Sequence, residues 1–337
     1  MDEISINSTS LHHIDLTSDD IQLIEVDEKH EAANNYARKL INDIRNEDVR
    51  RNFSLNSLTT EINNTILNLL EGRIFNETAQ IIANRLLLKE KEAQRKYGHI
   101  TDIKKGSLIQ CYLKLNDSHT YVITKVDHNS IIDIKDLDEK TGPPFDKKVL
   151  KAALFQYNQE LEVTNIHIYD SNTKISEYWW KDFLELKEIN SDELNTRTSF
   201  NAVDNYLGRK IKPKSPSDRT FLRNNLISYY RTQSEFDYNI MIDTVVGSYE
   251  PRDIELDLEK IKEDLLQLPQ KHKFDTKFTI KSKEISARFR TIIELLPHID
   301  LLIKENIPEL KNVIQPQLEN NIKYIKIRSD TGYDYFK

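Results

Sequence analysis

Glycine is scarce in this sequence, with seven residues among 337 and no two of them closer than eight positions. That spacing leaves no room for the glycine pairs of a phosphate-binding loop, a dinucleotide-binding fingerprint or a nucleophile elbow. Such loops need glycine because backbone N–H groups must approach an anion closely. The sequence therefore excludes the usual NTPases, nicotinamide-dependent dehydrogenases and α/β-hydrolases.

Cysteine is rarer still. Cys111 is the single one, so we expect no internal disulfide and no thiolate metal cluster, and a buried, inert thiol. The N-terminal residues MDEISINSTSLHH are polar and acidic, unlike a signal peptide. No apolar run approaches the roughly 18–20 residues of a spanning helix. We expect a cytoplasmic protein with no membrane segment.

Metal-ligand spacing is also missing. The nine histidines are scattered, and no H-E-x-x-H motif occurs. His12 and His13 are adjacent, but neighbouring side chains on a strand point to opposite faces of a sheet. No nucleophilic triad is visible along the chain. The sequence therefore predicts no metal, no cofactor and no catalytic residues.

The spacing of apolar residues divides the chain into helical and extended stretches. In the first part it predicts strands at 11–16 and 21–26, helices at about 28–48, 58–70 and 76–98, strands at 107–115, 119–126 and 130–135, and a helix at 147–157. Beyond that it predicts a strand at 161–169, helices at 177–186, 191–209 and 252–267, a helix through Tyr230 that Asp218 caps, and strands at 274–280, 287–295 and 321–328.

This order predicts an α+β protein, because helices precede and follow a central run of strands. The clearest change of period, from 3.6 to 2, falls near residue 106. We expect a mainly helical N-terminal region at 1–105 and a central antiparallel sheet with packed helices at 106–190. A helical region with a basic loop should follow at 191–268, and a β-rich C-terminal region at 269–337.

Charge is the most informative feature. Residues 205–231 hold seven Lys or Arg and one acidic residue, a net charge of +6, whereas the whole chain carries −7. The rest of the chain is therefore at −13. Pro213 and Pro216 predict an extended loop that leads into a helix start, where cations and free N–H groups both meet phosphates. The candidate nucleic-acid contacts are Arg209, Lys210, Lys212, Lys214, Arg219 and Arg223.

Two alternatives to this assignment of the DNA contacts stay open. The stretch is also consistent with a solvated loop whose cations pair with the acidic remainder of the chain. A second basic stretch, at 89–105, offers another candidate surface. Its cations are Lys89, Lys91, Arg95, Lys96, Lys104 and Lys105.

The order of motifs resembles the bacterial nucleoid-associated protein family of the 37-kilodalton type. The segments that carry the likeness are GSLIQCYLKLNDSHTYVITKVDHNSIIDI, KKVLKAALF, EYWWKDFLEL, DNYLG, RFRTIIEL and NIKYIKIRSDTGYDYF. The resemblance implies a cytoplasmic protein located at the nucleoid that binds DNA. It brings no catalytic motif, and the basic residues named above come from the charge pattern alone.

The favoured hypothesis is a non-enzymatic DNA-binding protein that contacts the phosphate backbone without strong sequence preference. One alternative is an effector or sensor of a bacterial anti-phage (antiviral defence) system, perhaps a metal-dependent nuclease that uses Asp127, Asp133 and Lys135. Another is an adaptor whose acidic surface binds a basic protein partner. The sequence leaves a protein partner and a homo-oligomer open.

Overall fold

The computed structural model describes residues 6–16, 20–25, 31–46, 51–98, 106–115, 118–127, 129–132, 139–142, 151–171 and 175–337. The chain divides into two compact units. The first comprises residues 1–190 together with 275–277, and the second comprises 191–274 and 278–337. The first unit is built on a large sheet and the second mainly on helices, so the predicted α+β class is confirmed.

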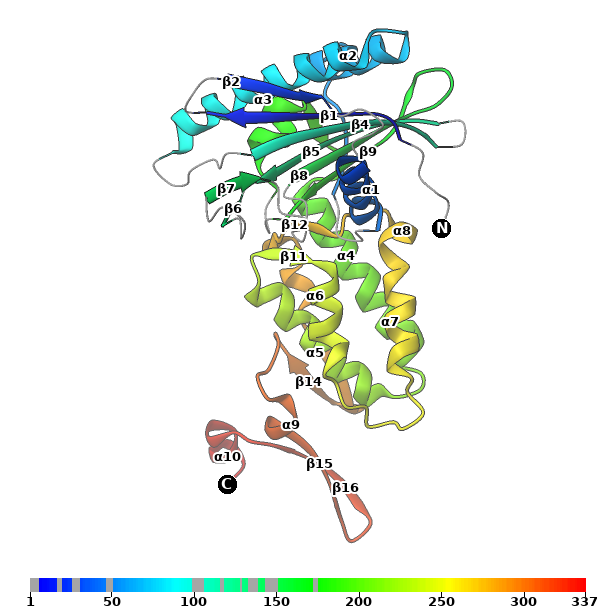
Figure 1. The fold of residues 1–337 in the computed structure, drawn as a ribbon. Coiled ribbons are helices and arrows are strands. Elements are labelled where there is room, and N and C mark those ends of the chain that lie inside the picture. Colours follow the sequence, from blue (N-terminus) through cyan, green and yellow to red (C-terminus); the bar gives the residue numbers. More distant parts are fainter. Residues whose placement is uncertain are drawn as a thin grey trace. The chain divides into compact units, whose positions relative to one another are not determined.

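An eight-stranded antiparallel sheet forms the first unit, in the order β10-β3-β9-β8-β5-β4-β1-β2 (Figure 1). Its strands are β1 (Ile6–Asp15), β2 (Asp20–Glu25), β3 (Arg51–Leu55), β4 (Gly106–Leu115), β5 (Ser118–Asp127), β8 (Lys151–Tyr157), β9 (Val163–Asp170) and β10 (Leu186–Glu188). A separate pair joins β6 (Asn129–Ile132) to β7 (Glu139–Gly142). The predicted hairpin is confirmed as β4–β5, with Tyr112 opposite Tyr121. The sheet combines β1, β2 and β3, which precede residue 106, with five strands that begin at residue 106 or later.

Helices cover both faces of this sheet. They are α1 (Glu31–Asn46), α2 (Glu61–Leu70) and α3 (Phe75–Tyr97), close to the predicted ranges. Ile66 of α2 packs in the same core as Leu108 of β4. Leu40 of α1 packs with the next strand residue, Ile109, in a separate core. Successive side chains of a strand point to opposite faces, so β4 contributes to both cores.

The predicted helix at 147–157 is wrong for residues 151–157, which form the central strand β8; residues 143–150 lie outside the described residues. The strand sequence KAALFQY has no polar alternation, because β8 lies between β5 and β9 with both faces covered. Ala152 and Leu154 are good helix formers, but the sheet pairing overrides that propensity.

Residues 275–277 contribute directly to the first unit. The buried Asp275 carboxylate accepts hydrogen bonds from the backbone N–H and the side-chain amide of Asn52, at 3.1 and 3.0 Å. Lys277 Nζ donates to the carbonyl of Asp170 at 2.9 Å. The Asp170 carboxylate in turn accepts from Lys151 Nζ at 2.6 Å. A segment distant in sequence thus completes the hydrogen bonding at the ends of β3, β8 and β9.

Helices dominate the second unit. They are α4 (Asp192–Tyr206), α5 (Pro216–Thr232), α6 (Tyr238–Ile242), α7 (Leu258–Leu266), α8 (Leu268–His272), α9 (Leu310–Val313) and α10 (Asp330–Phe336), with π-helical turns η2 (Leu207–Ile211) and η3 (Asp243–Gly247) and 3-10 turns η4 (Ser282–Glu284) and η5 (Ser286–Arg288). Short strands form the pairs β11 (Glu235–Asp237) with β12 (Lys277–Thr279), β13 (Thr291–Leu296) with β14 (Ile299–Ile303), and β15 (Ile314–Glu319) with β16 (Ile322–Ile327). An aromatic cluster occupies the core, where Phe236 stacks on Phe278 with ring centroids 4.3 Å apart. None of the described helices is long and apolar enough to cross a membrane.

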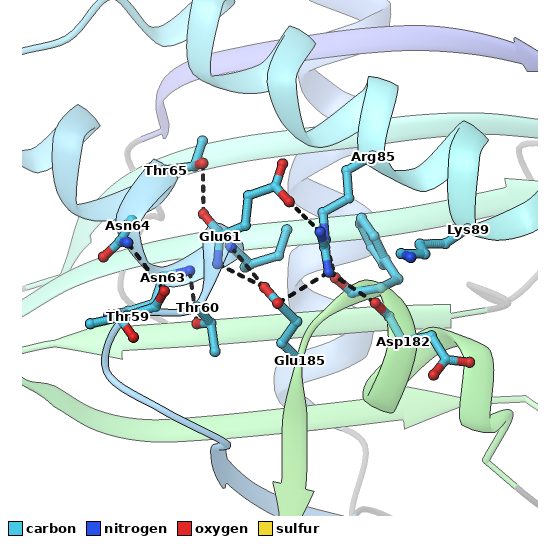
Figure 2. A network of polar contacts seen from close by, with 12 residues as sticks. Thr59, Thr60, Glu61, Asn63, Asn64, Thr65, Arg85, Lys89, Asp182 and Glu185 are labelled. Carbon is cyan, nitrogen blue, oxygen red and sulfur yellow. Dashed lines mark hydrogen bonds and ion pairs between the residues drawn. The ribbon is translucent and has the colours of Figure 1, made fainter.

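One half-buried arginine, Arg85 of α3, joins α2, the end of the π-helical η1 (Tyr178–Phe183) and the connection before β10 in the first unit (Figure 2). It donates to the carbonyls of Asp182 and Phe183, at 3.0 and 2.8 Å, where η1 ends. It also pairs with Glu61 and with Glu185, the latter at 3.4 Å. Glu185 accepts the backbone N–H of Glu61 at 2.8 Å, which adds to the cap at the start of α2.

We predict that Arg85→Ala lowers the free energy of unfolding of the first unit by about 1.5–3 kcal/mol, because it leaves two carbonyls and two carboxylates without their charged donor. Both tryptophans, Trp179 and Trp180, lie in this unit, so their fluorescence in a urea titration reports it. Arg73→Ala, at an exposed position in the turn after α2, is the control and should change stability by about 0.5 kcal/mol or less. Equal effects of the two substitutions would contradict the role of Arg85.

His12 gives the first unit a dependence on acidic pH. Its side chain is fully buried in β1. Burial lowers the pKa of this imidazole to about 4, and a polar contact with Gln80 opposes the shift only in part. Because the unfolded chain binds the proton near pH 6.5, His12 stabilises the fold fully above that pH. This contribution is lost as the pH falls from about 6.5 to about 4.

We predict that the free energy of unfolding drops by on the order of 3 kcal/mol over that window because of His12 alone. His12→Leu and His12→Gln both remove the titrating group, so both should flatten the dependence between pH 6.5 and 4. The measurement is the urea midpoint of tryptophan fluorescence at several pH values. A slope that matches the unsubstituted protein in both variants would show that another group is responsible.

Candidate nucleic-acid interface

The predicted extended basic loop is instead a helical turn. At the end of α4 the chain continues into η2, in which Leu207 and Ile211 are buried. The backbone N–H of Lys212 donates to the carbonyl of Leu207 at 3.0 Å, the five-residue spacing of a π-helix. Pro213 then has no N–H to offer, so the helix cannot continue. The prediction of an extended loop is therefore wrong, because the buried pair holds this stretch in helical form.

Four of the six candidate cations project into solvent from this turn. They are Arg209, Lys210, Lys212 and Lys214. None of the four forms an ion pair with a residue that the structure describes. Lys210 still acts at longer range, since it is the weakest of the groups that lower the pKa of Asp264, after Lys260 and Tyr206. We call these four residues the basic turn.

The other two candidates are bound within the protein. Arg223 is buried and donates from Nε to Asp204 Oδ1 at 2.8 Å, and it also donates to the hydroxyl of Thr291 and the carbonyl of Arg288. Arg219 lies 3.6 Å from the same carboxylate. Loss of hydration and the neighbouring Arg223 lower the pKa of Arg219, while Asp204 acts in the opposite direction. The six candidates thus divide into an exposed set of four and an internal pair.

Asp218 is not the N-cap that the sequence suggested. Ser215 is the N-cap of α5, and its hydroxyl accepts the backbone N–H of Asp218 at 3.2 Å. The Asp218 carboxylate is buried and accepts from Tyr249 Oη and from the N–H groups of Arg252 and Asp253, at 2.5, 2.8 and 3.0 Å. Burial alone would raise its pKa, but these bonds together hold the pKa below its ordinary value.

This arrangement has two consequences for anion binding. The one acidic residue within 205–231 is committed internally, so it does not pair with the cations of the basic turn. The start of α5 is also largely occupied. Pro216 has no N–H, and the N–H groups of Asp218 and Arg219 bond to Ser215. Phosphate contact through free N–H groups at this helix start is therefore not supported, and the cationic side chains remain.

Sequence reasoning missed two cations that pack on Phe221 of α5. The guanidinium of Arg252 lies 4.6 Å from the ring centroid, and Lys311 Nζ lies 5.8 Å from it and 5.5 Å from the ring of Tyr249. Both cations are exposed. Lys311 also lines a pocket of about 380 Å³ together with Asn224 and Asn225. These contacts join segments far apart in sequence, so no local pattern could have indicated them.

The second basic stretch is less available. Lys89 pairs with Glu92 at 2.8 Å, and Lys91 and Lys96 also have partners. Lys104 and Lys105 lie outside the described residues. The nuclease candidates Asp133 and Lys135 lie outside them too. Across the part of the chain that the structure describes, no group of three His, Cys, Asp or Glu side chains is placed to hold a metal ion.

Comparison with known proteins agrees with the resemblance seen in the sequence. Residues 11–296 match the sequence model of a protein family described as nucleoid-associated protein YejK. No protein with a curated description matches the chain. The matched residues include the basic turn and most of both compact units.

We predict that Arg223→Ala and Arg209→Ala differ sharply in their effect on the second unit. Arg223→Ala removes four internal contacts and should lower the free energy of unfolding by about 1.5–3 kcal/mol. Arg209→Ala, at the surface, should change it by about 0.5 kcal/mol or less. Amide hydrogen exchange in α5 measures the effect, because this unit contains no tryptophan. Equal protection of α5 in the two variants would refute the assignment of Arg223 as an internal residue.

Proposed function

Because the chain belongs to the nucleoid-associated protein YejK family, we propose that it binds DNA through the basic turn. The family gives the protein a nucleoid-associated role in bacteria. The observation that carries the proposal is the exposure of Arg209, Lys210, Lys212 and Lys214, unpaired among the described residues, on a chain of net charge −7.

The chemistry of these four side chains favours phosphate as the group they contact. A lysine ammonium acts as a point charge, and contacts to phosphate carry no direct information about base sequence. An acidic protein repels DNA over most of its surface, so binding has to be local. We therefore expect binding that is sensitive to salt and tolerant of sequence, without chemical change to the DNA.

The proposal narrows the six candidates to four. Arg219 and Arg223 support the turn from inside, because Asp204 holds both of them. No observation favours the alternatives of an anti-phage effector or an adaptor for a basic protein. The family description names neither of them.

The test is a salt titration of binding by fluorescence anisotropy, on two duplexes of unrelated sequence. If the four cations neutralise four phosphates, log affinity should fall against log salt with a slope of about −3.6. Changing Lys210, Lys212 and Lys214 together to Glu should abolish binding at moderate salt. The corresponding triple Ala variant should keep weaker binding with a flatter slope. The two duplexes should bind with similar affinity.

A matched control separates a local surface from net charge. Lys271, Lys283 and Lys304 are exposed in the same unit and form no ion pair with a described residue. Changing these three to Glu alters the net charge by the same amount, so it should weaken binding far less than the change in the basic turn. Equal losses in the two triple variants, or unchanged affinity in the first, would exclude the basic turn as the DNA-binding surface.

A further inference from the structure

An aromatic side chain near the start of α5 holds two exposed cations. Phe221 is half-buried, and the guanidinium of Arg252 and Lys311 Nζ lie 4.6 and 5.8 Å from its ring centroid. Neither cation forms an ion pair with a residue that the structure describes. A cation that contacts a ring and no carboxylate keeps its charge available for an anionic strand.

The same ring lines the pocket of about 380 Å³ beside α5. Tyr249, Asn225 and Lys311 line it as well. The side-chain amide of Asn225 donates to the carbonyl of Val245 at 3.3 Å, but its oxygen accepts no hydrogen bond from a described residue. The pocket thus combines two aromatic side chains with an unused acceptor. A flat ring that carries amino groups can meet both of them.

The charges of the pocket favour a neutral ring over an anion. Glu250 and Glu309 line the pocket together with Lys311, and the Glu309 carboxylate accepts from the side-chain amide of Asn312 at 2.9 Å. A phosphate group inside the pocket would meet two carboxylates, and like charges brought together are unfavourable. A nucleobase is neutral, and its ring stacks on aromatic side chains and on guanidinium planes.

The pocket lies close to the basic turn along α5. The Asp218 carboxylate, in the first turn of the helix, accepts from Tyr249 Oη and from the backbone N–H of Arg252, at 2.5 and 2.8 Å. From Pro216 to Phe221 the helix rises by about 7–8 Å. Nucleotides of a stacked strand advance by about 3.4 Å each, so two or three of them span that distance. One strand can therefore reach the basic turn and the pocket together.

Two π-helical turns pack against this helix. The turn η2 carries Arg209 and Lys210, and η3 leads directly into the pocket residues Ser248 and Tyr249. Both turns contact α5. The π-helix is rare and occurs frequently at functional sites, so two such turns against one helix support a binding surface there.

We propose that the pocket beside α5 receives an unpaired base of a DNA strand whose phosphates contact the basic turn. The inference rests on the proposed function, and it adds the class of DNA that the protein prefers. Bases of a closed duplex are stacked and paired, so they cannot enter the pocket unless the duplex opens. Single-stranded or locally opened DNA should therefore bind more tightly than a closed duplex.

The test compares a single strand of mixed sequence with the duplex formed from that strand, by fluorescence anisotropy at one salt concentration. Charge alone favours the duplex, because it carries more phosphates per unit length. The full-length protein should nevertheless bind the single strand about tenfold more tightly, which is the contribution of one stacked base. Changing Arg252 and Lys311 together to Gln should abolish this preference, with unchanged helical circular dichroism.

A matched control removes the same charge elsewhere in the second unit. Arg290 and Lys304 are exposed and form no ion pair with a described residue. Changing both to Gln should leave the preference for the single strand intact. Equal losses of preference in the two double variants would overturn the pocket, because net charge would then account for the effect.

The outcomes also separate this inference from the proposed function. Equal affinity for strand and duplex, with binding still lost when Lys210, Lys212 and Lys214 become Glu, would overturn the pocket and leave the basic turn as the DNA-binding surface. Unchanged binding of both forms in that triple variant would exclude the basic turn, and with it the strand path proposed here.

Photo-cross-linking locates the base directly. A single strand that carries one iodouracil is irradiated in the complex, and mass spectrometry identifies the attached residue. The attachment should fall on Phe221 or Tyr249, and Phe221→Leu should lower the yield at Phe221 to background while helical circular dichroism stays unchanged. Attachment only at residues outside the pocket would overturn the proposal.

Discussion

The carboxylate of Asp204 is the contact on which the charge arrangement of the second unit depends. It holds Arg223 at 2.8 Å and Arg219 at 3.6 Å, at the junction of α4 and α5. Without it, two guanidinium groups would lie partly buried with no counter-charge, which is costly in a protein interior. Because the pair is satisfied internally, the connection between the two helices can end in a tight turn. The remaining cations of the connection then point outward.

Burial of Asp218 completes this separation of charge. An acidic side chain among seven cations would ordinarily pair with some of them at the surface. Here the hydroxyl of Tyr249 and two backbone N–H groups donate hydrogen bonds to its carboxylate oxygens instead. Its charge therefore stabilises the start of α5 and the segment at 249–253. The basic turn keeps its positive potential although the chain as a whole is acidic, which is what local binding to a polyanion requires.

The first unit shows how polar side chains can join segments that lie far apart in the sequence. Arg85 connects α3 with the end of η1 and with the cap of α2, and Asp275 satisfies the start of β3. Each of these groups adds hydrogen bonds to backbone atoms of another segment. The sheet and its helices thus form one unit that includes three residues from far along the chain.

Local patterns determined much of this protein. The helical spacing of apolar residues at 61–97 reflects helices that bury one face, and the alternation at 106–127 reflects paired strands. Burial of this kind leaves a periodic pattern that can be read from one sequence. The excess of cations at 205–231 and the absence of glycine loops are likewise properties of sequence alone.

Tertiary structure decided the rest. Residues 151–157 form a strand because β5 and β9 pair with its two edges, and Arg223 is internal because Asp204 and the carbonyl of Arg288 bind it. Burial and pairing of a charged side chain depend on atoms brought from distant positions, which the local sequence does not contain.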